Sequence, residues 1–128
     1  MEFDAFKKFS FENLEVYRSS RDLVKEIYIL QKKFPSEEKY ALCDQIRRSA
    51  SSITSNIAEG AGRMSIKEKI HFIEIAYGSM MESFSQLQIA QDLGYVREDD
   101  VEALRPLYNK VALLMSRLRN SFEQKLPK

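Results

Sequence analysis

Apolar residues recur at alternating steps of three and four along most of this 128-residue chain, the spacing that places side chains on one face of a helix. The pattern predicts four helices, at about residues 12–33, 37–61, 66–93 and 98–122. Their apolar series run through Val16, Leu23, Ile27 and Leu30; Leu42, Ile46, Ile53 and Ile57; Ile70, Ile73, Tyr77, Met80 and Leu87; and Val101, Leu104, Tyr108, Val111 and Met115. We expect each series to face a shared core.

The residues between these series are typical of helix boundaries. A Phe-Pro pair at 34–35 ends the first helix, because proline disfavours helical geometry in the residue before it, and Ser36 is the expected cap of the second. Ser65 and Glu68 have the spacing of a capping box at the start of the third helix, which Gly94 closes.

Three further residues mark the later boundaries. Gly60 and Gly62 lie where the second helix needs a C-terminal cap. Pro106 lies inside the fourth helix, where it removes a backbone hydrogen bond and predicts a kink.

The number and length of these segments predict the architecture. Segments of this length form helices roughly 30 to 42 Å long, and short connections make neighbouring helices antiparallel. We therefore predict an all-α fold, an up-down-up-down antiparallel four-helix bundle that occupies residues 1–128 as one domain. Within this domain residues 1–11 form an N-terminal arm, either a docking segment or a frayed start, with four aromatic residues: Phe3, Phe6, Phe9 and Phe11.

The third helix carries a second series roughly opposite the first. Its members are Ile75, Ser79, Glu82, Gln86, Ile89 and Leu93. Water covers that face in a monomeric bundle, so the three apolar residues favour contact with another copy of the chain. The alternative is a scatter of surface apolar residues, which is common in soluble proteins.

One flank of the second helix is unusually rich in small and polar residues. Its members are Gln45, Ser49, Ser52, Asn56, Glu59 and Arg63. Serine is a poor helix former, and a solvated face normally carries Lys and Glu, so we favour a tight contact with another helix or subunit. Within this flank Asn56, Glu59 and Arg63 are candidates for a polar network.

Composition narrows the class of protein. Four glycines and three prolines are too few for the turns of a β-sandwich, while 44% hydrophobic residues suffice for a core. The single cysteine, Cys43, cannot form an internal disulfide. Neither a signal sequence nor an apolar run of bilayer length is visible. We expect a cytoplasmic protein without a membrane partner.

Few residues are suited to catalysis. His71, the only histidine, lies three residues from both Glu68 and Glu74, and the Glu-x-x-His spacing of di-metal bundles occurs once. One histidine and one cysteine cannot build a zinc site, and no glycine-rich phosphate loop is present. We expect no catalytic residue, no metal site and no cofactor, and hence no enzyme.

The charge distribution leaves nucleic-acid binding open. Twenty basic and nineteen acidic residues give a net charge of +1, yet basic residues cluster locally. Arg63 and Lys67 flank the expected turn between the second and third helices, where free N–H groups also attract anions. Arg47 and Arg48 are adjacent in the second helix. The alternative is that these cations form salt bridges within the chain.

The run QIRRSASSITSNIAEG at residues 45–60 resembles the signature of the four helix bundle protein family, which includes proteins encoded in intervening sequences of 23S rRNA genes. Segments 34–42, 76–82 and 93–95 match as well, so the likeness covers about residues 12–120. The resemblance implies a four-helix bundle assembled as a ring-shaped homopentamer. Accessory proteins of diversity-generating retroelements are similar, and they bind nucleic acid and a reverse transcriptase.

Two functions follow from these observations. The first is a non-enzymatic, homo-oligomeric bundle that binds RNA or a ribonucleoprotein partner through Arg47, Arg48, Arg63 and Lys67, repeated around a ring. The second is a scaffold that binds another protein, with arginines that serve salt bridges within and between subunits.

Overall fold

The computed structural model describes residues 4–127, and within them every regular element is a helix. The elements are η1 Ser10–Asn13, α1 Glu15–Gln31, η2 Ser36–Glu38, α2 Leu42–Ala61, α3 Ile66–Asp92, α4 Glu98–Glu102 and α5 Arg105–Glu123, where η marks a short 3-10 helix. The prediction of an all-α fold is confirmed.

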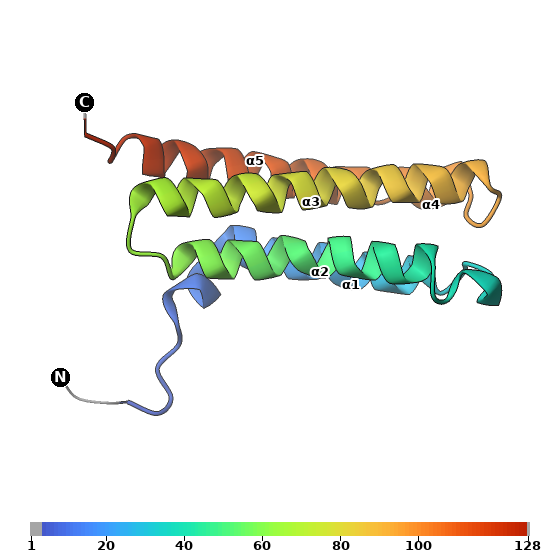
Figure 1. The fold of residues 1–128 in the computed structure, drawn as a ribbon, viewed down its shortest axis with the longest axis horizontal. Coiled ribbons are helices and arrows are strands. Elements are labelled where there is room, and N and C mark those ends of the chain that lie inside the picture. Colours follow the sequence, from blue (N-terminus) through green and yellow to red (C-terminus); the bar gives the residue numbers. More distant parts are fainter. Residues whose placement is uncertain (1–3, 128) are drawn as a thin grey trace.

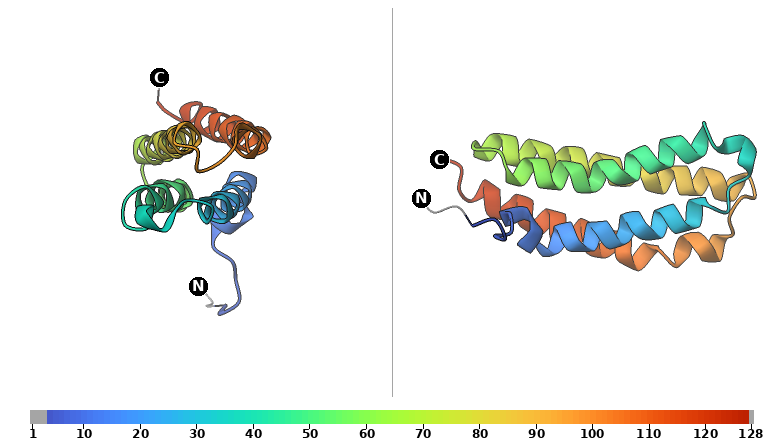
Figure 2. Two further views of the ribbon diagram at one scale, coloured as in Figure 1. Left: turned by 90° about the vertical axis from the view of Figure 1, so that its right-hand side faces the viewer. Right: turned by 90° about the horizontal axis from the view of Figure 1, so that it is seen from below.

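The helices form a bundle of two layers. Figure 1 shows α1 beside α2 in one layer, and α3 beside α4 and α5 in the other. Seen end-on, α1, α2, α3 and α5 occupy the corners of a square, and each contacts the two helices at adjacent corners (Figure 2). The four long helices α1, α2, α3 and α5 alternate in direction, and the short α4 leads into α5 along the same corner (Figure 2).

The predicted apolar series fill the space between the layers. Their central members are fully buried: Leu23, Ile27, Ile46, Ile53, Ile57, Ile73, Met80, Leu87, Val111 and Met115. Burial of each such side chain contributes about 1.5–3 kcal/mol. Tyr77 is the exception in the series of α3, since it is 45% exposed, and Ala76 packs in the core beside it.

The second helix begins later than predicted. Residues 36–38 form a 3-10 turn, the side chain of Ser36 caps nothing, and α2 starts at Leu42. Backbone hydrogen bonds from Glu38 to Pro35 and from Ala41 to Glu38 close tight turns that reverse the chain between two antiparallel helices. That reversal competes with the α-helical geometry that the apolar spacing favoured.

The segment at 98–122 is two helices instead of one. The chain breaks at Ala103 and Leu104, and Pro106 occupies the first turn of α5. A proline there costs little, because the first N–H groups of a helix have no partner within it. Pro106 therefore starts a helix where we expected it to kink one.

The expected cap residues of α3 are confirmed, although among the described residues only the Ser65 half of the capping box forms a hydrogen bond. The Ser65 hydroxyl accepts a hydrogen bond from the Glu68 backbone N–H at 3.2 Å. At the other end Gly94 has φ +79°, and the Tyr95 N–H donates to the Ala90 carbonyl at 2.9 Å, which closes a left-handed cap. Gly62, by contrast, ends α2 in right-handed geometry.

The N-terminal arm lies outside the bundle. Residues 4–9 run away from the layer of α1 and α2 (Figure 1), and Phe6 and Phe9 are exposed. Phe11 packs edge-on against Tyr17 of α1 with ring centroids 4.8 Å apart, so the arm is anchored at its C-terminal end. Phe3 lies outside the described residues. None of the helices found in 4–127 combines the length and apolarity needed to cross a membrane.

Candidate functional site

The polar flank of α2 packs against α3 of the same chain. The Ser49 hydroxyl donates to Gln86 Oε1 at 2.7 Å in a buried position, and the hydroxyls of Ser52 and Ser79 are 2.8 Å apart. Asn56 Nδ2 donates to the Ser52 hydroxyl at 2.8 Å. The predicted tight contact is therefore a contact between helices, and Ser79 and Gln86 from the second series of α3 belong to it.

The expected network of Asn56, Glu59 and Arg63 divides into two parts. Asn56 bonds Ser52, whereas Glu59 Oε1 accepts from Arg63 Nη2 at 2.6 Å. The Arg63 guanidinium also lies over the ring of Phe72, 4.6 Å from its centroid. Arg63 thus joins the end of α2 to α3, a cation–π contact that adds about 0.5–1 kcal/mol at a partly exposed site.

The remaining members of the second series are exposed on α3. Ile75, Ile89 and Leu93 are 37%, 45% and 55% exposed, and Glu82 lies among them and accepts a hydrogen bond from Gln86 Nε2 at 3.4 Å. They form an apolar margin beside the polar contact of α2 with α3. We call these four residues the outer margin of α3.

The four cations predicted to bind RNA differ in their surroundings. Arg47 donates to Gln31 Oε1 at 3.4 Å and to the Lys39 carbonyl at 3.3 Å, so it ties α2 to α1 and to the turn before α2. Arg48 pairs with Asp44 at 3.2 Å, but its side chain remains 80% exposed. Lys67 is exposed in the first turn of α3.

These four cations do not form one patch on a single chain. Arg47 and Arg48 lie near the start of α2, and Arg63 lies just beyond its end. Sixteen residues of helix correspond to about 24 Å. Within one chain, two of these cations therefore lie at one end of the bundle, Arg47 and Arg48, and two at the other, Arg63 and Lys67.

A basic groove between α1 and α5 was not predicted from the sequence. It has a volume of about 750 Å³, and its lining comprises Glu15, Arg18, Ser19, Arg21, Asp22, Lys25 and Lys110. Four cations thus face two carboxylates, and Lys110 is 4.0 Å from Glu15. The spacing of residues 18, 21 and 25 places three cations on one helix face, so the sequence contains a signal for this part of the groove. The presence of Lys110 in the groove could not be predicted, because it depends on how α5 packs against α1.

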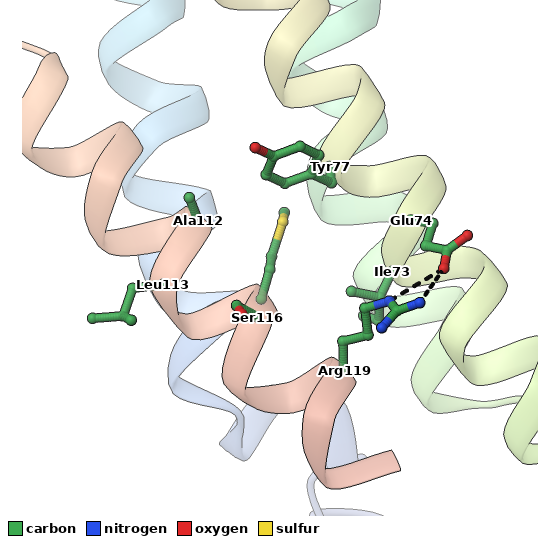
Figure 3. Close-up of a pocket in the computed structure, with 8 residues that line it drawn as sticks. Ile73, Glu74, Tyr77, Ala112, Leu113, Ser116 and Arg119 are labelled. Carbon is green, nitrogen blue, oxygen red and sulfur yellow. Dashed lines mark hydrogen bonds and ion pairs between the residues drawn. The ribbon is translucent and has the colours of Figure 1, made fainter. Parts of the chain in front are cut away.

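A second groove, between α3 and α5, is largely apolar. It has a volume of about 490 Å³ and is lined by Ile73, Glu74, Tyr77, Ala112, Leu113, Met115, Ser116 and Arg119. Figure 3 shows Tyr77 projecting from α3 toward α5, Leu113 on the flank of α5 that points away from Tyr77, and Arg119 reaching from α5 to Glu74 of α3. That ion pair has an N–O distance of 2.8 Å.

The groups considered for catalysis do not converge. His71 is exposed, and its ring stacks edge-on with Phe72. Cys43 is buried, and desolvation raises the pKa of its thiol, which makes the nucleophilic thiolate scarce. Across the described part of the chain, no three His, Cys, Asp or Glu side chains gather in a way that would hold a metal ion.

The fold and these surfaces define an all-α protein of the four-helix bundle class. The chain belongs to the family described as 23S rRNA-intervening sequence protein, which matches residues 12–117. It is similar to a crystal structure of a protein of unknown function from the S23 ribosomal protein family of Bacteroides thetaiotaomicron. That likeness has a TM-score of 0.71 and 26% sequence identity, and it covers 79% of this chain and 95% of the other. A comparison with curated proteins gave no match.

Proposed function

We propose that this protein is a non-enzymatic, homo-oligomeric bundle that binds RNA through basic residues repeated around a ring of subunits, with five subunits as the resemblance implies. The observation that carries the RNA proposal is the α1–α5 groove, where Arg18, Arg21, Lys25 and Lys110 outnumber two carboxylates. A phosphodiester backbone is the ligand whose repeated single charges suit such a row of cations. The family description contains the term 23S rRNA, which makes RNA the first nucleic acid to test.

Two exposed cations on the second and third helices are separate candidates for RNA contact. Arg48 and Lys67 retain exposed side chains, so they are the members of the original set that we propose as RNA contacts. Arg47 and Arg63 have partners within the chain, and we propose that they position α2. In a ring, each surface recurs once per subunit, which multiplies its attraction for a polyanion.

Self-association through the outer margin of α3 completes the proposal. Ile75, Ile89 and Leu93 lie on one helix beside the polar contact of α2 and α3, and their burial by another copy removes apolar surface from water. We assign the contact between subunits to this margin together with Glu82.

Fluorescence anisotropy with a labelled single-stranded RNA tests the binding. The variant Arg21→Ala/Lys25→Ala removes two groove cations, and Lys32→Ala/Lys125→Ala removes two exposed cations outside the groove as a matched control. We expect Kd to rise with salt concentration. In Arg21→Ala/Lys25→Ala the loss of two phosphate contacts reduces the slope of log Kd against log salt concentration by about 1.4. Absence of binding at about 50 mM salt, or equal effects of both variants, contradicts the groove as the RNA site.

The scaffold remains the second candidate, and one observation favours it. Three of the four arginines and lysines first proposed for RNA already have partners within the chain: Arg47, Arg48 and Arg63. A scaffold with structural arginines predicts that Arg47→Ala lowers stability while the protein has no RNA affinity to lose.

A further inference from the structure

The N-terminal arm exposes two phenylalanine side chains to solvent, and neither is buried against the bundle of its own chain. Phe6 is 94% exposed and Phe9 72% exposed. The contacts of the arm are local, since the Phe6 N–H bonds Asp4 Oδ1 at 3.0 Å and Phe9 stacks beside Phe11 with centroids 6.2 Å apart. Single exposed apolar residues are ordinary, but two phenylalanines on one projecting segment are typical of a docking peptide.

The α3–α5 groove has the size to receive both rings. A benzene-sized ring fills a cavity of about 150 Å³, and the groove measures about 490 Å³. Residues 112–119 of α5 line it over about 10 Å. Phe9 has φ −73° and ψ 152°, close to polyproline II, a conformation that places residues three positions apart on the same side and about 9 Å apart. Tyr77 and Leu113 offer exposed apolar walls.

The charges of the arm and the groove are complementary. Arg119 bridges Glu74 and Glu123, so this end of the groove carries two carboxylates against one guanidinium. The arm has Lys7 and Lys8 between its phenylalanines and one carboxylate, Asp4. A net positive arm therefore meets a net negative end of the groove.

We propose that the arm of one copy, residues 4–9, docks in the α3–α5 groove of a neighbouring copy, with Phe6 and Phe9 seated between the two helices. The arm of the same chain is poorly placed to do so. It leaves the bundle from the layer of α1 and α2, whereas the groove lies in the opposite layer, with α1 and α2 behind it (Figures 1 and 3).

The two surfaces of this contact differ, and this determines the symmetry. An arm of one copy in the groove of the next is a head-to-tail interface, which generates a ring when the rotation closes and a filament when it does not. The inference rests on the self-association proposed above and deepens it, because it supplies a second, directional contact in addition to the outer margin of α3.

Mass measurement by size-exclusion chromatography with light scattering tests the arm. We compare the unaltered chain with Phe6→Ser/Phe9→Ser, with Leu113→Glu in the groove, and with the control Tyr40→Ser, which removes an aromatic ring that is 86% exposed elsewhere. Loss of two buried phenyl rings raises the concentration of half-dissociation about 100-fold, and Tyr40→Ser leaves it unchanged. Circular dichroism verifies that each variant remains helical.

Engineered cysteines identify the partner groove directly. A chain with Phe9→Cys and Leu113→Cys carries one thiol on each side of the proposed contact, so oxidation of the folded protein joins successive copies into a ladder of bands beyond the dimer. A chain with Phe9→Cys and Tyr40→Cys is the matched control, because Tyr40 is exposed outside both the groove and the outer margin of α3. The protein is alkylated before the denaturing gel, which prevents Cys43 from reacting after unfolding.

The outcomes separate this inference from the proposed function. Arm docking is supported if the chain with Phe9→Cys and Leu113→Cys forms the ladder, the control pair does not, and Phe6→Ser/Phe9→Ser assembles more weakly. Unchanged assembly of the arm variant, or equal ladders with both cysteine pairs, overturns arm docking but leaves self-association standing. A chain that is monomeric at every concentration overturns both.

Discussion

A Cβ atom added to Gly60 would lie 2.9 Å from the Cβ of Phe72, so α2 and α3 approach each other here more closely than any larger residue permits. Gly60 is buried inside α2 and has ordinary helical geometry, so its role is the absence of a side chain. The same approach brings Arg63 over the Phe72 ring. Phe72 therefore limits the separation of the helices through its Cβ and contacts Arg63 through its ring.

The first prediction concerns this close approach. Gly60→Ala forces Phe72 or α3 to move and lowers the free energy of unfolding by about 1–3 kcal/mol, despite the better helix propensity of alanine. Gly78→Ala is the matched control, because nothing lies within 4 Å of its added Cβ, and we expect about 0.5–1 kcal/mol of stabilisation. Urea denaturation measures both. Equal gains in stability from the two variants would contradict the role of Gly60.

The second prediction concerns the buried polar contact between α2 and α3. Ser49→Ala removes the hydroxyl that donates to Gln86 Oε1 and leaves that buried oxygen without its donor, at a cost of about 1–3 kcal/mol. Ser51→Ala is the control, since the Ser51 hydroxyl bonds only its own helix. Thermal unfolding compares the two variants. A larger loss from Ser51→Ala would show that the contact with Gln86 contributes nothing.

The third prediction separates two adjacent arginines. Arg47→Ala breaks hydrogen bonds that join α2 to α1 and to the preceding turn, and lowers the free energy of unfolding by about 1 kcal/mol. Arg48→Ala removes an exposed pair with Asp44 and costs about 0–0.5 kcal/mol. In RNA titrations the order reverses, with Arg48→Ala the more harmful. An order of stabilities opposite to this one argues against a positioning role for Arg47.

The fourth prediction is a pH dependence. Hydrogen bonds from the Arg97 backbone N–H and from Lys33 hold the pKa of Asp100 below its usual value. A carboxylate with a lowered pKa contributes stability above its unfolded pKa, and that contribution is lost as pH falls through the folded pKa. Asp100→Asn therefore destabilises the protein at pH 7, and the difference narrows below about pH 4.

Urea denaturation at about pH 7 and about pH 2 checks this expectation. The neighbouring variant Asp99→Asn serves as the control, because it removes an exposed carboxylate from the same helix turn without breaking the link from α4 to Lys33 in the turn after α1. A difference between Asp100→Asn and the unaltered chain that persists at about pH 2 would contradict the assignment.

The sequence predicted the bundle well where a local signal had no competitor. The spacing of Ile46, Ile53 and Ile57 has one reading, a buried helix face, and the left-handed cap at Gly94 needs only its own residue. Prediction was poorer at residues 36–41 and at Pro106. There the reversal of direction between antiparallel helices decides the backbone, and no periodic pattern records it.

The candidate site followed the same division. Small and polar residues on α2 indicated a close contact, but the serines could not reveal whether the partner was a helix or a subunit; the hydrogen bond from Ser49 to Gln86 decided this. Likewise, the sequence places three cations on one face of α1. That Lys110 joins them in one groove could not be predicted, because it depends on which helix packs beside α1.

The sequence by itself determined the helical class, the buried faces and the family, because these depend on residue spacing and on residue identity. Only the tertiary structure decided which polar residues find partners within the chain and which remain available to ligands. The reason is physical: a helix face is set by a local period of 3.6 residues, whereas a pair such as Arg119 and Glu74 depends on the packing of helices that are far apart in the chain.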